Sequence, residues 1–386
     1  MIPYGRQDIS EADVAAVVEV LKSDFLTQGP AVELFERAVA DYCGADRAVS
    51  ASSATAALHL ACLALGVGPG DLVWTSPISF VASANCALYC GAEVDFVDID
   101  PHTYTMSIEA LSDKLERAAR QDRLPKVVIP VHLCGQSCRM DEIKRLADAY
   151  GFSIVEDASH AIGGSYKGGA IGSCRFSDIT VFSFHPVKIV TTGEGGIALT
   201  NKPELSDKMA LLRSHGVTRD PALMHGPADG PWYYQQVALG FNYRLTDIQA
   251  ALGNSQLQRV DGFVRRRTEL ADRYTRSLKE LPLTLPWQHP DTSSAWHLYV
   301  IRLKPDQISL SRGEVFGRLR SSDIGVNLHY IPIHTQPYYL NLGFKRGDFP
   351  EAERYYEGAI TIPLFSGMSD AQQDKIIQCL EQTLIP

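Results

Sequence analysis

One lysine, Lys188, occupies a position from which a side chain can do covalent chemistry. It lies just past residues 179–184, an apolar run of β-branched and aromatic residues that we expect to form a buried strand ended by Pro186. In an open parallel sheet, ligands bind beyond the carboxyl ends of the strands. A lysine at this point is either a solvated loop charge or a nucleophile that forms a Schiff base with a carbonyl compound. The residue alone does not decide between the two.

An aspartate and a run of small hydroxyl residues offer two further functional groups. Asp157 follows a predicted strand at 152–156, within V-E-D-A-S-H-A-I-G-G, and either serves a site or caps a turn. Residues 50–65 read S-A-S-S-A-T-A-A-L-H-L-A-C-L-A-L, so small hydroxyl side chains open an Ala/Leu helix. Free backbone N–H groups at such a helix start favour a phosphate, with Ser53 or Thr55 adding a hydroxyl; the alternative is an ordinary N-cap.

These three groups together match the needs of pyridoxal 5′-phosphate (PLP). Its aldehyde condenses with a lysine amine, its phosphate needs hydrogen-bond donors, and its ring nitrogen needs an anion that keeps it protonated. The order and spacing of the hydroxyl-rich helix start, Asp157 and Lys188 therefore indicate a PLP enzyme.

No metal site is expected. Two pairs of cysteines share one spacing, Cys86 with Cys90 and Cys134 with Cys138. The first pair falls in an apolar, helix-like run, so buried thiols explain it better than zinc ligands. Pro332 prevents His329 and His334 from sharing a helix face, and we expect them to be site or surface histidines. The cysteines are expected to be reduced.

The hydrophobic pattern predicts the elements that must position these groups. Between residues 71 and 156, apolar strands alternate with helical segments, which is typical of an α/β protein with a mostly parallel sheet covered on both faces. After a Pro-rich stretch at 281–290, the pattern changes to α+β, with expected strands at 296–303 and 325–330 and helices at 312–321 and 370–384. We expect a large domain over residues 1–255, with an N-terminal segment that lines the substrate, and a smaller C-terminal domain over residues 256–386. Residues 215–230 form either a lid or a disordered excursion.

Composition narrows the range of partners. A chain of 386 residues can form a large core and two domains. Its formal net charge is −9, without runs of Lys or Arg, so we expect no nucleic-acid partner. No apolar run approaches the roughly eighteen residues of a spanning helix, and no leader is apparent. We therefore expect a cytoplasmic protein that does not associate with membranes.

Three motifs resemble the DegT/StrS family of sugar-nucleotide aminotransferases: E-D-A-S-H-A-I-G, S-F-H-P-V-K with T-T-G-E-G-G, and G-F-N-Y-R-L-T-D-I-Q-A-A-L-G. The resemblance spans nearly the whole chain and implies the architecture of the fold-type I PLP aminotransferases. It implies Lys188 as the lysine that bonds PLP and Asp157 as the partner of the ring nitrogen, which makes these two residues catalytic. It places Phe80 and His160 against the two ring faces. The implied phosphate ligands are Thr55, Ala56 and Ser183.

Within this family the chain resembles most closely the subgroup that makes 4-amino sugars for pseudaminic acid, through S-P-I-S-F-V-A, S-H-A and F-H-x-x-K. This implies that glutamate donates an amino group, through PLP, to the 4-keto carbon of a UDP-linked 2-acetamido-2,6-dideoxy-4-keto-L-hexose. The product would be UDP-4-amino-4,6-dideoxy-N-acetyl-L-altrosamine. The residues implied at the substrate are Tyr4, Asp24, Phe25, Leu26, Thr27, Ala54, Ser183, Leu328, His329, Tyr330 and Ile331.

The resemblance also implies a homodimer. In the family, the asparagine that stands here at Asn242 reaches the cofactor phosphate of the neighbouring subunit. Phe25, Leu26 and Phe241 would be poorly placed on the surface of a monomer. We therefore expect active sites at a two-fold interface.

Three alternatives remain. The substrate could be another nucleotide-linked keto-sugar, carried by dTDP or GDP and aminated at C3 or C4. The family also contains 3-dehydratases, but these replace the lysine with histidine, and Lys188 argues against that activity. A non-catalytic regulator would bind PLP without exchanging an amino group.

Overall fold

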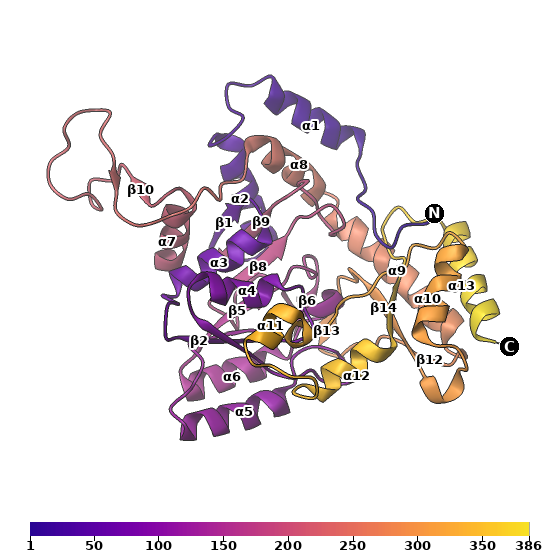
Figure 1. The fold of residues 1–386 in the computed structure, drawn as a ribbon. Helices are drawn as coiled ribbons and strands as arrows, with labels where there is room; N and C mark the ends of the chain where they lie inside the picture. Colours follow the sequence, from indigo (N-terminus) through magenta and orange to yellow (C-terminus); the bar gives the residue numbers. More distant parts are fainter. Residues whose placement is uncertain (386) are drawn as a thin grey trace.

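A seven-stranded sheet forms the centre of the protein, which a computed structural model describes over residues 1–385 (Figure 1). Its strand order is β1 (Arg47–Ala51), β9 (Gly196–Thr200), β8 (Ile179–Ser183), β5 (Ser153–Asp157), β4 (Val127–Ile129), β2 (Leu72–Thr75) and β3 (Glu93–Phe96). The neighbouring strands from β8 to β3 are parallel, while β9 runs antiparallel to both β8 and β1. The predicted α/β fold with a mostly parallel sheet is confirmed.

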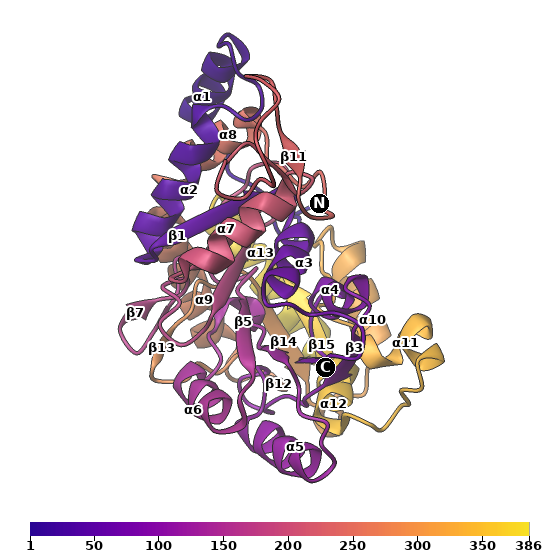
Figure 2. The same cartoon turned by 90° about the vertical axis from the view of Figure 1, so that its left-hand side faces the viewer.

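Helices cover both faces of this sheet (Figures 1 and 2). Val155 and Val181 pack on the face covered by α3 (Ala54–Ala64), α4 (Ala82–Tyr89) and α7 (Pro203–Arg213). The opposite face packs against α5 (Ile108–Arg120) and α6 (Met140–Tyr150) at Ile154, and against α2 (Pro30–Cys43) and α8 (Asp247–Leu257) at Phe182. Successive strand residues point to opposite faces, so burial of both faces requires the continuous apolar runs seen in the sequence.

Local signals set several helix ends. The helix α1 (Glu11–Leu21) begins after a capping box, in which Ser10 accepts a hydrogen bond from the Asp13 amide and the Asp13 carboxylate accepts one from the Ser10 amide. The helix α2 ends at Gly44, whose φ of 73° is accessible to glycine at little cost. Both signals lie in the local sequence, so these helix ends do not depend on distant contacts.

The C-terminal part forms a second apolar cluster around a small antiparallel sheet of β12 (Leu283–Thr284), β14 (Tyr299–Leu303) and β15 (Ala359–Ile362). It includes residues of α10 (Arg312–Ser321) and α13 (Asp370–Leu384), together with Ile2 from the N-terminus, which lies beside this part in Figure 1. The long helix α9 (Val260–Leu278) connects the parts, since Phe263 packs in a cluster with α2 and Tyr274 packs in the C-terminal one. The domain boundary at 255/256 stays a prediction.

The predicted strand at 325–330 is wrong. This segment forms an isolated bridge between Asn327 and Thr361 instead of a strand, and the Gly325 amide donates a hydrogen bond to the Ile2 carbonyl. The next amide, that of Leu328, donates to the side-chain oxygen of Asn327 at 2.8 Å. That local bond replaces a ladder partner, and the chain turns toward the cavity described below.

The remaining elements are short. They are β6 (Ser165–Tyr166), β7 (Gly169–Ala170), β13 (Thr292–Ser293), β10 (Val217–Thr218), β11 (Gln235–Gln236), α11 (Pro337–Asn341), α12 (Pro350–Gly358) and the 3-10 turns Leu133–Gly135, Pro305–Gln307 and Ile333–Thr335. The segment between β10 and β11 projects from the body, at the left of Figure 1. Its apolar side chains include exposed Trp232 and Leu223. Across residues 1–385, the helices lack the combination of length and apolar character that a bilayer-spanning segment needs.

Candidate active site

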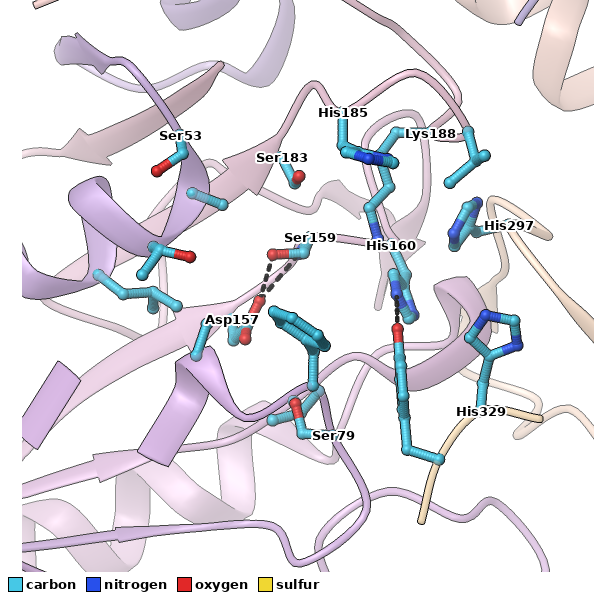
Figure 3. Close-up of a pocket in the computed structure, with 18 of the residues that line it drawn as sticks. Ser53, Ser79, Asp157, Ser159, His160, Ser183, His185, Lys188, His297 and His329 are labelled. Atoms are coloured by element: carbon cyan, nitrogen blue, oxygen red, sulfur yellow. Dashed lines mark hydrogen bonds between the residues drawn. The ribbon is translucent and has the colours of Figure 1, made fainter. Parts of the chain in front are cut away.

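A cavity of about 590 Å³ opens at the carboxyl ends of β5 and β8 (Figure 3). Most of the residues implied at the site line it: Tyr4, Ala54, Thr55, Phe80, Asp157, His160, Ser183, Lys188, His329 and Tyr330. They come from segments spread over more than three hundred positions of the chain, so the fold brings together what the sequence separates.

The pairing of β5 with β8 brings Lys188 and Asp157 to one edge of the sheet. Asp157 is the last residue of β5 and lies opposite Val181 of β8. The strand β8 ends at Ser183, and a turn closed by the Lys188 amide on the His185 carbonyl (2.9 Å) returns the lysine to the cavity. Burial lowers the pKa of Lys188 to about 8, against the raising effect of the Asp157 carboxylate. About a tenth of the amine is therefore neutral, and nucleophilic, at pH 7, far more than for a lysine of ordinary pKa.

Two serines hold the Asp157 carboxylate. Oδ1 accepts from the amide of Ser159 at 3.1 Å and from its hydroxyl at 2.5 Å, and Oδ2 accepts from the hydroxyl of Ser83 at 2.5 Å. Figure 3 shows the Ser159 contacts. The side chain is buried and acceptor-only, so it can face a cationic group in the cavity without moving.

The start of α3 borders the same cavity. Ser53 caps the helix, since its Oγ accepts from the Ala56 amide at 3.1 Å. That bond occupies the Ala56 N–H, while the preceding amides of Ala54 and Thr55 have no hydrogen-bond partner in residues 1–385. Ser183 adds a hydroxyl. This combination of free N–H groups, hydroxyls and a helix N-terminus suits a phosphate.

Glycine is required where β9 meets this helix start. A Cβ at Gly196 would lie 2.4 Å from the Ala54 nitrogen and 2.5 Å from the Ser53 carbonyl carbon. Gly196 is the register partner of Ser183 in the sheet. Its close backbone approach to Ser53 and Ala54 therefore holds the Ser183 hydroxyl near the start of α3, where the candidate phosphate site lies.

Four histidines line the cavity, and three of them, His160, His297 and His329, are buried. The rings of His160 and His297 lie 4.4 Å apart between centroids. Burial, with the nearby Lys188 charge, holds the pKa of His160 and His297 well below the usual value and lowers that of His329 to about 3. All three rings are therefore neutral at pH 7, and Lys188 is the only Lys or Arg among the lining residues of the described chain.

Several residues implied by the resemblance lie away from the cavity of this single chain. Ala56 and Leu328 pack in or against the apolar cluster of the sheet, and Ile331 is exposed. The segment from Asp24 to Thr27 lies beside the start of α8, where the Asp247 amide donates to the Leu26 carbonyl at 3.0 Å and Thr27 bridges Thr246. Phe25 lines a separate cavity between α1, α2 and α8. Asn242 bridges Ser214.

The cavity also contains residues that the sequence analysis did not single out, chiefly Ser79, Ser159, His185, Glu194 and His297. Ser159 was available from the sequence, because it lies two positions after Asp157 and can bond its carboxylate locally. His297 had no local signal, because its place depends on a contact with a distant loop.

The lining residues fit PLP. The candidate phosphate site at α3, the carboxylate of Asp157 and the amine of Lys188 are the three groups that this cofactor needs. The aromatic side chain of Phe80 is available to cover a ring face. Within residues 1–385, no cluster of three or more His, Cys, Asp or Glu side chains is arranged to hold a metal ion.

Known proteins share this architecture. A sequence profile of the DegT/DnrJ/EryC1/StrS aminotransferase family matches residues 7–381. The chain is 40% identical over 382 residues to the spore coat polysaccharide biosynthesis protein SpsC of Bacillus subtilis (strain 168), covering 98% of this chain and 96% of SpsC. The PMP form of Spr1654 from Streptococcus pneumoniae superposes with a TM-score of 0.89 at 32% identity, over 99% of each chain, and its PLP form is also similar. PseC of Helicobacter pylori, an aminotransferase involved in the biosynthesis of pseudoaminic acid, has a TM-score of 0.90 at 30% identity, over 99% of each chain.

Proposed function

This chain belongs to the DegT/DnrJ/EryC1/StrS aminotransferase family, and on that basis we propose that it transfers an amino group from glutamate to the 4-keto carbon of a UDP-linked 2-acetamido-2,6-dideoxy-4-keto-L-hexose. The protein is a PLP-dependent sugar aminotransferase. The proposed product is UDP-4-amino-4,6-dideoxy-N-acetyl-L-altrosamine, a precursor of pseudaminic acid. The similarity to PseC over nearly the full length of both chains supports this choice of sugar.

The observation that carries the catalytic part of the proposal is the meeting of Lys188 and Asp157 in one cavity beside the start of α3. When bound, PLP supplies an aldehyde that takes up amino groups and a ring that accepts electrons. Lys188 would bond that aldehyde, and Asp157 would hold positive charge on the ring nitrogen. The α3 amides of Ala54 and Thr55 and the hydroxyl of Ser183 would bind the phosphate.

The lowered pKa of Lys188 also suits it to proton transfer. Once released from its covalent bond, this amine lies in the cavity and, with a pKa near 8, can both accept and return a proton close to neutral pH. We propose that Lys188 carries the proton to and from the substrate carbon.

The sugar would be bound by neutral polar groups. Tyr4, His329 and Tyr330 line the cavity, and none of them carries charge at pH 7 because burial raises the pKa of both tyrosines and lowers that of the histidine. Such groups suit the hydroxyl, keto and amide oxygens of an acetamido sugar.

The negative charges of the substrates and cofactor call for more hydrogen-bond donors than one chain places in the cavity. Lys188, the only Lys or Arg among the described lining residues, is assigned to chemistry, while PLP, UDP and glutamate are all anionic. We propose a homodimer in which the partner's Asn242 reaches the cofactor phosphate. The segment from Asp24 to Thr27 is exposed on this chain and is proposed to border the nucleotide sugar at the dimer interface.

A second candidate substrate is another nucleotide-linked keto-sugar, carried by dTDP or GDP and aminated at C3 or C4. The 40% identity with SpsC, a spore coat polysaccharide biosynthesis protein, supports this second candidate.

The test is an amination assay of the purified protein with PLP, glutamate and a panel of UDP- and dTDP-linked 4-keto sugars. We expect the UDP-linked acetamido-L-hexose to be turned over fastest and Lys188→Arg to be inactive, because arginine keeps the charge but cannot form the covalent bond. Preference for a dTDP sugar would replace the proposed substrate. Near-normal turnover by Lys188→Arg would overturn the assignment of the lysine.

A further inference from the structure

Two buried serines form a hydrogen-bonded chain that ends on the catalytic carboxylate. The hydroxyl of Ser79 lies 2.6 Å from that of Ser83, and the Ser83 hydroxyl lies 2.5 Å from Oδ2 of Asp157. The exposed fractions are 3% for Ser79, 0% for Ser83 and 5% for Asp157. This hydrogen-bonded pair of serines is therefore shielded from bulk water. In the protein interior, hydrogen bonds are stronger than in water and reinforce one another.

The direction of each hydrogen bond in this chain is fixed. The carboxylate can only accept, so Ser83 donates its one hydroxyl hydrogen to Asp157. The competing acceptor, the Phe80 carbonyl, lies farther from the same hydroxyl, at 3.3 Å. Since the hydrogen of Ser83 is used on the carboxylate, Ser83 must accept from Ser79. Ser79 thus donates to Ser83, and Ser83 donates to Asp157.

The two carboxylate oxygens of Asp157 accept different numbers of hydrogen bonds. Oδ1 accepts two hydrogen bonds, both from Ser159, while Oδ2 accepts only the one from Ser83. A carboxylate oxygen has room for about two donors. Oδ2 is therefore the oxygen with capacity left for a further donor from the cavity.

We propose that Ser83 is a positioning residue that keeps the negative charge on Oδ2 of Asp157 and the shared proton on the cofactor ring nitrogen, and that Ser79 strengthens this effect. This inference rests on the proposed role of Asp157 as the partner of that nitrogen. Hydrogen bonds to the charged form of an acid stabilise that form. Without the Ser83 hydroxyl, the buried carboxylate holds a proton more strongly, and the proton shared with the ring nitrogen moves toward the oxygen.

The location of the two serines connects this effect to other parts of the site. Ser79 lines the cavity, and Phe80, the side chain proposed to cover a ring face, follows it directly. Ser83 lies in the first turn of α4, which begins at Ala82. One short segment thus supplies both the ring contact and the hydrogen-bond chain to Asp157.

The experiment measures the protonation state of the PLP ring nitrogen directly. Protein is reconstituted with PLP labelled with ¹⁵N in the ring, and the nitrogen resonance of the bound cofactor is compared among wild type, Ser83→Ala, Ser83→Cys and Ser79→Ala. Ser76→Ala is the matched control, because Ser76 is a buried serine of the same segment whose hydroxyl accepts from the Ile78 amide and has no contact with Asp157.

We expect a protonated nitrogen in the wild type and a shift toward the unprotonated value in Ser83→Ala, with smaller shifts for Ser83→Cys, whose thiol is a weaker donor, and for Ser79→Ala. Ser76→Ala should give the wild-type resonance. If Ser83→Ala does not fold, the other two variants carry the same test. A protonated wild-type nitrogen that none of the Ser79 and Ser83 variants shifts would overturn the role of Ser83 alone. An unprotonated nitrogen in the wild type would overturn the proposed role of Asp157 itself.

Discussion

The hydroxyl of Tyr330 lies 3.2 Å from Nε2 of His160, and the other nitrogen of that ring accepts a hydrogen bond from the Cys134 amide at 3.2 Å. Because Nδ1 is an acceptor and the ring is neutral, the single ring hydrogen is on Nε2. His160 therefore donates to Tyr330. The hydroxyl hydrogen of Tyr330 is left free to donate to a substrate oxygen in the cavity.

Tyr330→Phe tests this arrangement. The change removes a donor that faces the cavity while it leaves the apolar ring in place. The loss of one hydrogen bond of about 1 kcal/mol to the substrate corresponds to roughly a fivefold to tenfold fall in kcat/KM. Steady-state kinetics with the preferred nucleotide sugar checks this, and unchanged glutamate half-reaction rates would show that the loss concerns the sugar. Equal losses in both half-reactions would contradict a role specific to the sugar.

The lowered pKa of Lys188 predicts how the apoprotein captures PLP as pH changes. Covalent capture requires the neutral amine, so its rate should rise with pH around a midpoint near 8, well below the ordinary value of 10.5. Absorbance on mixing apoprotein with PLP at a series of pH values measures this. Asp157→Asn should move the midpoint lower, since the carboxylate raises the pKa of Lys188. A midpoint near 10 would show that the amine is solvated.

The lowered pKa of Lys188 also predicts how the stability of the apoprotein changes with pH. The folded pKa of Lys188 lies below the unfolded one, so the unfolded chain binds more protons between these values. The contribution of Lys188 to apoprotein stability is therefore least favourable below pH 8 and improves as pH rises from about 8 toward 10.5. Lys188→Met, which removes the buried amine, should remove this part of the pH dependence in urea unfolding.

Asp157→Asn should reduce turnover without unfolding the protein. Asparagine keeps the shape and one oxygen acceptor but loses the charge that would hold the ring nitrogen protonated. We expect a fall in kcat on the order of 100-fold, the scale of a lost electrostatic contact at a reacting centre. Circular dichroism and thermal melting provide the fold control. A folded variant with nearly unchanged kcat would return Asp157 to the role of a turn cap.

Gly196→Ala should distort the candidate phosphate site through a steric clash. The new Cβ would lie 2.4 Å from the Ala54 nitrogen, so the start of α3 must shift. We expect a loss of about 1–3 kcal/mol in the free energy of unfolding and weaker PLP binding. Gly317→Ala is the matched control, because it lies in α10 with nothing within 4 Å of its Cβ, and it should be stabilising by about 0.5 kcal/mol. Normal PLP affinity in Gly196→Ala would contradict the proposed phosphate position.

Much of the fold could be predicted because its signals are local. The buried strand β8 is a continuous run of β-branched and aromatic residues, and the capping box of Ser10 and Asp13 marks the start of α1. The segment 325–330 (G-V-N-L-H-Y) alternates apolar and polar residues as a strand would, but the Asn327 side chain supplies the hydrogen bond that a neighbouring strand would otherwise provide. Composition alone does not reveal that competition.

The site residues also fall into those that local sequence signals predict and those that depend on distant contacts. Asp157 ends β5, Lys188 lies in the turn just after β8, and Ser53 caps α3, so their grouping follows from the rule that parallel strands open at one edge. The backbone of His297 is held beside the cavity by its amide, which donates to the Cys134 carbonyl at 2.9 Å, a contact that joins residues far apart in the chain. Ser83 meets Asp157 across a separation of 74 residues. Contacts of this kind depend on packing that no local pattern specifies.

Asn242 lies outside the cavity of its own chain, where it bridges Ser214, so a role at the cofactor phosphate requires a second subunit. Exposed apolar side chains, including Phe25, Leu26 and Leu239, would be covered in such a dimer.

Mixing two inactive proteins, Lys188→Ala and Asn242→Ala, tests the exchange of residues across the two-fold axis. In a mixed dimer, one site lacks both residues and the other has both, so random subunit exchange should restore about a quarter of wild-type activity. The control is Lys188→Ala mixed with a Lys188→Ala/Asn242→Ala double variant, which contains no intact site. Activity that stays absent after subunit exchange has been demonstrated by mass spectrometry, or full activity of a monomer in dilute solution, would rule out the shared site. Recovery confined to the first mixture would place Asn242 in the neighbouring subunit's site.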